Sequence, residues 1–173
     1  MTAFIALLRA VNVGGTGKLP MAELQAMCKA CGFTGVRTYI ASGNVVFASG
    51  KSEAQVKKLL EAKLAAYAGK PVGAALRTAA EMAAVLAGNP FAERAGNRSV
   101  AIFLDEAPPA DALAKASGAG AEEEMHLGTR EIYVFYGEGM AHTKLKIPAA
   151  KGGTARNMNT IAKLAEMAAA EAG

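Results

Sequence analysis

The order of apolar segments along residues 4–77 is the feature that most constrains the fold of this chain. Phe4 to Leu8 is continuously apolar and precedes a Gly-rich segment, which is typical of a central strand covered on both faces. Stretches with the apolar spacing of helices then alternate with short apolar runs. The sequence therefore predicts helices and strands mixed along the chain.

The next three elements are predicted from stop signals and periodicity. A first helix is expected between Pro20 and Gly32, because an apolar stripe at helical spacing lies between them. Residues 36–40 alternate in polarity and the apolar run 45–48 follows a turn sequence, which predicts a β-hairpin. A second helix is expected to begin after Ser52, because Ser52 and Gln55, three residues later, can form a capping box. Its predicted buried face consists of Val56, Leu59, Leu60, Leu64 and Tyr67.

A fourth strand, expected over residues 72–77, completes the order βαββαβ. This order is that of the split βαβ, or ferredoxin-like, unit. A third helix with a capping box at Thr78 ends at Gly88, and Asn89-Pro90 is the natural linker after it. We therefore expect a ferredoxin-like subdomain over residues 1–88 and a second subdomain over residues 89–173.

The second half is predicted to be a smaller α+β subdomain related to the first. Its strands are expected at residues 99–104, 123–127 and 131–136, the last two forming a hairpin. Helices are expected at residues 110–117 and 159–170, with a short helix or turn at 144–150. This order resembles the first half without its closing strand. The fold class predicted for the whole chain is α+β.

Charge and composition limit the partners. The net charge is +4, but residues 1–85 carry ten basic and four acidic side chains, whereas residues 86–173 carry nine and eleven. A basic half favours phosphate-bearing partners, although the same surplus also serves solubility. No stretch reaches the ~18 apolar residues of a membrane span. Two cysteines are too few for a disulfide framework, which agrees with a cytoplasmic protein in a reducing compartment.

Gly-rich segments at the ends of predicted elements supply candidate anion sites. The segment from Gly14 to Lys18 joins a strand to a helix, where backbone N–H groups can hold anions, but it lacks the residues of a P-loop. A flexible loop, in which glycines allow positive φ, also explains this segment and is the preferred explanation. Residues 151–157 place a Gly-rich turn and a cation before the last helix, although Thr154 or Asn157 could simply cap that helix. The candidate ligand-binding residues are Arg9, Asn12, Gly14, Gly15, Lys18, Lys144, Arg156 and Asn157.

Ser42 and Asn44 are weaker candidates. Both lie at the hairpin turn, where backbone geometry alone explains Gly and Asn. In a ferredoxin-like unit we expect this turn at the sheet end opposite the loop after the first strand. The two clusters therefore need not share one site.

Cysteine and histidine do not predict a metal or cofactor. Cys28 and Cys31 lie at the C-terminal end of a predicted helix, where the dipole disfavours a thiolate, and no further cysteine could complete a zinc site. We expect them to pack in the core. No Ser, His and Asp set has the spacing of a catalytic triad; His126 is expected on a strand and His142 in a loop.

Five segments resemble one known family. They are residues 6–15, 21–24 and 39–47, the pair Lys144-Leu145, and residues 154–157. The chain is similar there to DUF1697, a bacterial family of unknown function. The resemblance implies an α+β fold of two subdomains and a cytoplasmic protein, but no activity. Met158 stands where the family usually has an aromatic residue, Ala155 where Thr or Ser is common, and Thr143 where Ser is common.

Three functions remain open. The first is binding of a phosphate-bearing ligand, a nucleotide or nucleic acid, in a cleft between the subdomains bordered by Arg9, Asn12, Lys18, Lys144 and Arg156. The second is a small enzyme acting on an anionic metabolite, oriented by Arg9 or Arg156, with an acid or His142 moving a proton. The third is a protein- or RNA-interaction module, in which Phe4 and Phe47 on the sheet face stack on bases; burial of both rings would exclude this use of the sheet. The oligomeric state is not predicted.

Overall fold

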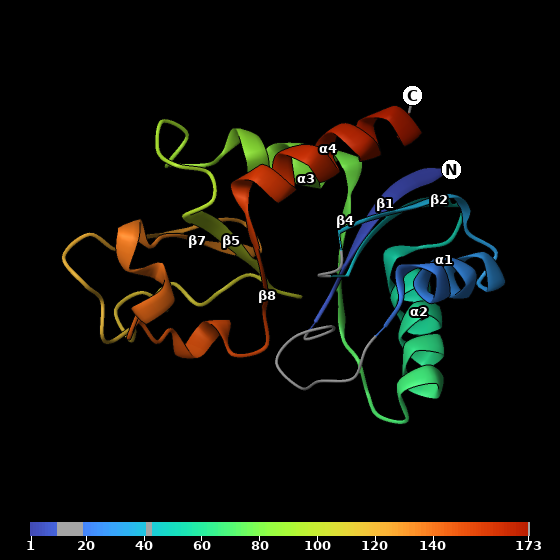
Figure 1. Ribbon diagram of the computed structural model, residues 1–173, viewed down its shortest axis with the longest axis horizontal. Helices are drawn as coiled ribbons and strands as arrows, with labels where there is room; N and C mark the ends of the chain where they lie inside the picture. Colours follow the sequence, from blue (N-terminus) through green and yellow to red (C-terminus); the bar gives the residue numbers. More distant parts are fainter. Residues whose placement is uncertain (10–18, 41–42, 173) are drawn as a thin grey trace. The chain divides into compact units, whose positions relative to one another are not determined.

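The computed structural model describes residues 1–9, 19–40 and 43–172. It has a mixed α/β fold, with two antiparallel four-stranded sheets and four α-helices in the described part (Figure 1). The chain forms two compact units: unit 1 contains Met1–Ala83 and Lys163–Gly173, and unit 2 contains Ala84–Ala162. None of the described helices is long and apolar enough to cross a membrane. The division into domains at residue 88 stays a prediction.

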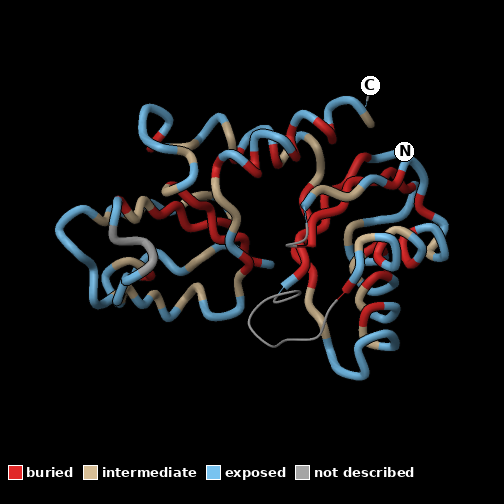
Figure 2. The backbone as a smooth tube through the Cα atoms, viewed as in Figure 1, coloured by how far each residue is buried: buried red, intermediate tan, exposed pale blue. Residues whose placement is uncertain are grey.

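The sheet of unit 1 has the order β2-β3-β1-β4, with every neighbouring pair antiparallel. Its strands are β1 (Thr2–Leu8), β2 (Thr34–Tyr39), β3 (Asn44–Ser49) and β4 (Ala74–Thr78). As expected for a central strand, β1 is buried from Ala3 to Leu8 (Figure 2). Its side chains alternate between the two faces, so both faces of the sheet are covered there.

Two helices, α1 (Met21–Ala30) and α2 (Glu53–Ala68), lie together on one face of this sheet (Figure 1). The capping box before α2 is confirmed: the Ser52 hydroxyl accepts from the Gln55 N–H at 3.2 Å, and the Gln55 side chain accepts from the Ser52 N–H at 3.0 Å. The predicted buried face of α2 was too wide, because Leu59 and Tyr67 are 37% and 47% exposed. The buried ridge is Val56, Leu60 and Leu64, spaced by four residues along the helix.

An aromatic stack lies between these helices and the sheet. The ring of Phe47 is parallel to that of Phe33, with centroids 4.3 Å apart, and lies 6.0 Å from the ring of Phe4. Phe4 and Phe47 are both buried. They cannot stack on nucleic-acid bases, so the hypothesis of RNA binding through these two rings was wrong.

The turn between β2 and β3 lies at the same sheet end as the end of β1. The Leu8 N–H donates to the Gly43 carbonyl at 2.8 Å, and the Arg9 N–H donates to the Gly73 carbonyl at 2.9 Å. We expected the turn at the opposite end, and that expectation was wrong, because β3 runs antiparallel to β1 and therefore begins where β1 ends.

The last helix, α4 (Met158–Ala172), begins in unit 2 and ends in unit 1. Its C-terminal part lies against β2, where Arg37 Nη2 donates to the Met167 carbonyl at 2.7 Å. Gly35, at φ +60°, lies so close to Glu171 that a Cβ there would be 2.0 Å from the carboxylate oxygen Oε1. The positive φ favours glycine at this position, and a Cβ there would require the flexible Glu171 side chain to turn aside.

Unit 2 contains the second sheet, with the order β6-β7-β5-β8. Its strands are β5 (Ser99–Phe103), β6 (Glu124–Leu127), β7 (Glu131–Phe135) and β8 (Thr154–Asn157), and β6 and β7 form the expected hairpin. The expectation that this half lacks a closing strand was wrong, because β8 pairs antiparallel with β5. Only four residues long, β8 has too short a sequence to show strand periodicity, and its pairing partner lies some fifty residues earlier in the chain.

The helix expected at residues 110–117 is absent, and the segment forms consecutive turns. Its backbone hydrogen bonds are isolated, such as Ala112 N–H to Pro109 at 3.0 Å and Lys115 N–H to Asp111 at 3.2 Å. Ala112 is the segment's one buried side chain. A helix this short needs tertiary packing along a face, and one alanine does not provide it.

Two 3₁₀ helices follow later in this unit, η1 (Gly137–His142) and η2 (Pro148–Ala150). The third α-helix of the chain is α3 (Ala79–Ala87).

Candidate functional site

The residues predicted to bind an anion fall into three groups. Asn12, Gly14, Gly15, Lys18 and Ser42 lie outside the described residues. Arg9 is exposed at the end of β1 in unit 1, and Asn44 is buried in the same unit, with its amide donating to the Tyr39 carbonyl at 2.9 Å. The third group, Lys144, Arg156 and Asn157, belongs to unit 2. That the candidates border one common cleft stays a prediction.

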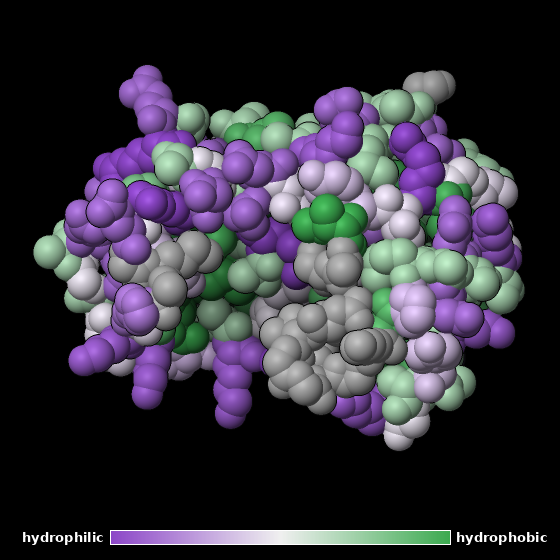
Figure 3. All heavy atoms as spheres, in the orientation of Figure 1, coloured by the Kyte–Doolittle hydropathy of each residue, from purple (hydrophilic) through white to green (hydrophobic). Residues whose placement is uncertain are grey.

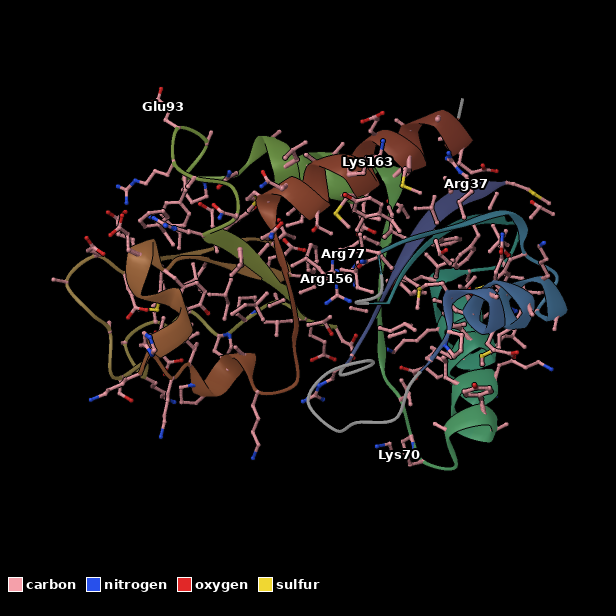
Figure 4. All side chains as sticks on the ribbon, viewed as in Figure 1. Arg37, Lys70, Arg77, Glu93, Arg156 and Lys163 are labelled. Carbon is pink, nitrogen blue, oxygen red and sulfur yellow. The ribbon has the colours of Figure 1, made fainter. Side chains whose placement is uncertain are left out.

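Arg156 and Asn157 end strand β8. The Asn157 side chain accepts from the Thr160 N–H at 2.9 Å, so it caps α4. Arg156 is half-buried, and one of its guanidinium nitrogens donates to the Ala155 carbonyl at 2.9 Å. Burial lowers the pKa of Arg156 to about 10, which leaves the group protonated at neutral pH. Figure 4 shows the position of this side chain on its strand.

Lys144 lies at a pocket formed within unit 2, which we call the 118–144 pocket. Its volume is about 300 Å³. Three segments of the chain meet there: the turn after residue 117, the end of β7 and the end of η1. The lining residues are Gly118, Gly120, Ala121, Glu122, Glu123, Tyr136, His142, Thr143 and Lys144.

Glu123 joins two sides of the 118–144 pocket. One carboxylate oxygen accepts from the Gly120 N–H at 2.6 Å, and the other accepts from the Thr143 hydroxyl. The Thr143 hydroxyl in turn accepts from the Leu145 N–H at 3.1 Å. One carboxylate oxygen therefore closes the local turn at Gly120, and the other holds this turn against the segment before Leu145.

A backbone contact keeps the same two segments close. Ser117 and Lys146 exchange N–H to carbonyl hydrogen bonds of 2.9 and 2.8 Å. Gly118 has φ +76°, and a Cβ on it would lie 2.1 Å from the Lys144 carbonyl oxygen. The pocket wall therefore requires a residue that tolerates positive φ and has no side chain.

Tyr136 supplies the aromatic ring of the 118–144 pocket. It packs against the buried cluster of this sheet, which includes Ile132 and Val134. Burial, and secondarily the charge of Glu123, raises the pKa of Tyr136, so the phenol stays protonated. Its hydroxyl can both donate and accept a hydrogen bond.

Three charged or titratable side chains of the 118–144 pocket have no internal partner. Among the described residues, Glu122, His142 and Lys144 form no ion pair or hydrogen bond through their side chains, and all three are exposed. Lysine and histidine can donate hydrogen bonds to an anion, whereas a carboxylate can only accept. The pocket thus presents groups of both signs to a ligand.

Sequence reasoning found Lys144 and named His142 but missed Glu122, Glu123 and Tyr136 as pocket residues. The run from Glu122 to Glu124 resembles an ordinary solvated acidic stretch. A signal was present in the glycines at 118 and 120, which mark a chain path that approaches another segment closely. The partner segment could not be identified from that signal.

A second pocket of about 340 Å³ adjoins the first and shares Ala121 and Glu122 with it. Its arginines are engaged: Arg94 pairs with Glu124 at 2.8 Å, and Arg98 with Glu138 at 3.5 Å. The Arg94 guanidinium also lies 4.7 Å from the ring centroid of Phe135, within range of a cation–π contact. Figure 3 shows hydrophilic residues along the outer margin of this unit.

The cysteines of α1 are expected to react slowly in the folded protein. Burial raises the pKa of the Cys28 thiol to about 12, and burial also raises the pKa of Cys31. Because the thiolate is the reactive form, alkylation of Cys28 at pH 8 should be at least a hundredfold slower in the native than in the unfolded protein. Mass spectrometry during iodoacetamide labelling, with and without denaturant, measures both rates. Equal rates would contradict core packing of this residue.

The protein is thus a small mixed α/β protein of two units, and its second unit carries a pocket large enough for a small ligand. The chain belongs to the protein family of unknown function DUF1697, whose model matches residues 1–133. The resemblance first noted in the sequence is thereby confirmed over that range; the similar segments around Lys144 and Arg156 lie beyond it.

A solved structure extends the comparison to nearly the whole chain. A conserved bacterial protein from Streptococcus pneumoniae is 28% identical, with a TM-score of 0.79, over 96% of this chain and 98% of that one. No curated protein matches this chain. The fold is therefore shared with a bacterial protein along almost its full length.

Proposed function

We propose that this protein binds a small phosphate-bearing ligand in the 118–144 pocket. The observation that carries the proposal is that Lys144, a candidate anion ligand by its sequence context, lines a pocket of about 300 Å³ together with His142, and neither side chain has an internal partner in the described residues. A lysine ammonium binds a phosphate as a compact charge with several donors.

The 118–144 pocket is favoured over its neighbour because the arginines of the neighbouring pocket are already paired with carboxylates. In the second pocket an anion would compete with Glu124 and Glu138 for the two arginines. In the 118–144 pocket, the carboxylate of Glu123 is held by Gly120 and Thr143 and does not engage Lys144. A ligand at Lys144 therefore does not have to break an ion pair of that lysine within the described residues.

The size of the 118–144 pocket favours a small molecule over a nucleic-acid strand. Its volume of about 300 Å³ lies at the lower end of the range for small-molecule sites. A nucleic-acid strand would need a longer row of cations along its backbone. Among phosphate-bearing ligands, a mononucleotide or a metabolite of similar size fits best.

Loss of the Lys144 charge should weaken binding of inorganic pyrophosphate. Removing one charge-assisted contact costs about 1.5–3 kcal/mol, which corresponds to a loss of affinity of roughly tenfold to a hundredfold. Calorimetric titration at low and high salt compares the wild type with Lys144→Ala. The control is Lys70→Ala, which removes an exposed lysine after the end of α2 in unit 1 (Figure 4).

Two results would overturn the proposal. One is an absence of pyrophosphate, nucleotide and short-oligonucleotide binding at every salt concentration. The other is equal loss of affinity in Lys144→Ala and Lys70→Ala, which would mean that net charge alone attracts the anion. Tighter binding of the oligonucleotide than of the mononucleotide would instead favour a nucleic-acid partner.

An enzyme acting on an anionic metabolite is the second candidate function. It is favoured by His142, which lines the same pocket as Lys144 and carries a group that can transfer a proton. Phosphorus NMR of the titration samples over time separates turnover from binding alone. A ligand that stays unchanged would leave binding as the function of the site.

We also propose the ferredoxin-like arrangement for unit 1 and a cytoplasmic location. The element order β1-α1-β2-β3-α2-β4 and the strand order β2-β3-β1-β4 support the arrangement. Cys28 and Cys31 are free thiols, which suits a reducing compartment. Fractionation of cells that produce the protein would test the location.

A further inference from the structure

The acidic run from Glu122 to Glu124 contains three carboxylates in three different situations. Glu123 has both oxygens hydrogen-bonded, and Glu124 is paired with Arg94 at 2.8 Å. Glu122 has no ion pair or hydrogen bond within the described part of the chain. It is therefore the one member of this run whose acceptor oxygens are available to a ligand.

The position of Glu122 depends on a close contact with Gly137. Gly137 has φ +66°, and a Cβ placed on it would lie 2.8 Å from Glu122 Oε2 and 3.0 Å from Glu122 Cβ. The side chain thus lies over a glycine at the start of η1, where a larger residue would push it away. This places the carboxylate in the lining of both pockets.

An unpaired carboxylate at a phosphate site requires a particular kind of ligand. A carboxylate repels a phosphate and can only accept hydrogen bonds, so the part of the ligand near Glu122 must carry donors. Lys144 and His142 line the same pocket and can hold the anionic end. A ligand that satisfies both ends has hydroxyl donors and a phosphate within one small molecule.

Resting on the function proposed above, we propose that the ligand is a sugar phosphate, either free or as part of a nucleotide. The sugar hydroxyls donate to Glu122, and the phosphate accepts from Lys144 and His142. This pairing of a carboxylate with sugar hydroxyls is used widely in nucleotide-binding sites. The hydroxyl of Tyr136, in the same lining, adds a group that can donate or accept.

The test compares three phosphates by calorimetric titration: inorganic phosphate, ribose 5-phosphate and phosphoethanolamine. The wild type should bind ribose 5-phosphate at least tenfold more tightly than inorganic phosphate. Glu122→Gln should reduce this ratio to below threefold, because the amide keeps one acceptor but loses the charge-assisted bonds. The control Glu93→Gln changes another exposed carboxylate of unit 2 (Figure 4) and should leave the ratio unchanged.

The ratio of affinities is the decisive quantity, because removing a negative charge can also strengthen phosphate binding by itself. An unchanged ratio in Glu122→Gln, or no preference for the sugar in the wild type, would overturn the inference while leaving phosphate binding intact. Tighter binding of phosphoethanolamine than of ribose 5-phosphate would mean that Glu122 binds an amine, and it would overturn the proposal that the ligand is a sugar phosphate. Failure of all three to bind would overturn the proposed function and this inference together. Adenosine monophosphate in a fourth titration distinguishes a nucleotide from a free sugar phosphate.

Discussion

Gly118→Ala is expected to lower the free energy of unfolding of unit 2 by about 3 kcal/mol, from a backbone cost of about 1–2 kcal/mol and a packing cost of about 1–3 kcal/mol. The backbone cost arises because an L-residue is strained at φ +76°. The packing cost arises because the new Cβ would lie 2.1 Å from the Lys144 carbonyl oxygen, a backbone atom that cannot turn aside. The segments on the two sides of the 118–144 pocket must then separate.

Gly69→Ala is the matched control for this prediction. Gly69 has φ +71°, nearly the same as Gly118, but a Cβ added to it would meet no heavy atom within 4 Å beyond its chain neighbours. It should therefore show the backbone cost of about 1–2 kcal/mol without the packing cost. Urea denaturation followed by circular dichroism measures both variants. Equal losses would mean that the contact between Gly118 and Lys144 contributes nothing.

Phe47→Ala should be the most damaging single substitution of the aromatic stack in unit 1, costing about 3–5 kcal/mol. Phe47 is fully buried and touches two other rings, so its removal leaves a cavity between the sheet and its two helices. Its neighbours are held in strands and helices and can close that cavity only in part.

Tyr67→Ala provides the comparison for Phe47→Ala. Tyr67 is also an aromatic residue of unit 1, but it is 47% exposed near the end of α2. Its removal should cost under about 1 kcal/mol. The same denaturation experiment gives both values. A loss below about 1 kcal/mol for Phe47→Ala would show that the ring stack does not stabilise this core.

The elements of unit 1 were predictable because their signals are local. The capping box at Ser52 and the one at Thr78, whose hydroxyl accepts from the Glu81 N–H at 3.2 Å, each involve residues three apart in the chain. Strand β1 was recognisable from a continuous apolar run for the same reason. Such patterns specify an element before any tertiary contact is known.

The errors share a non-local cause. Strand β8 exists because Thr154 to Asn157 pairs with β5, and nothing within those four residues indicates that pairing. The place of the hairpin turn beside Leu8 follows from the antiparallel pairing of β1 with β3, which is a property of the sheet. Residues 110–117 carry helix formers but too little buried surface to hold a helix.

The candidate site was predictable in part for the same reason. Lys144 was found because cations near Gly-rich segments are a recognisable local pattern. Glu123 joins the site through its hydrogen bond with Thr143, twenty residues further along the chain. The availability of Glu122 is known only once the partners of Glu123 and Glu124 are known.

The path of the chain through the two units has a consequence for folding during synthesis. Unit 2 is one continuous stretch, Ala84–Ala162, whereas unit 1 also needs the segment beginning at Lys163. A ribosome therefore releases all of unit 2 before the helix segment whose Met167 carbonyl accepts from Arg37 has emerged. The unit whose synthesis begins first is completed last, and until then β2 lacks the helix that packs against it.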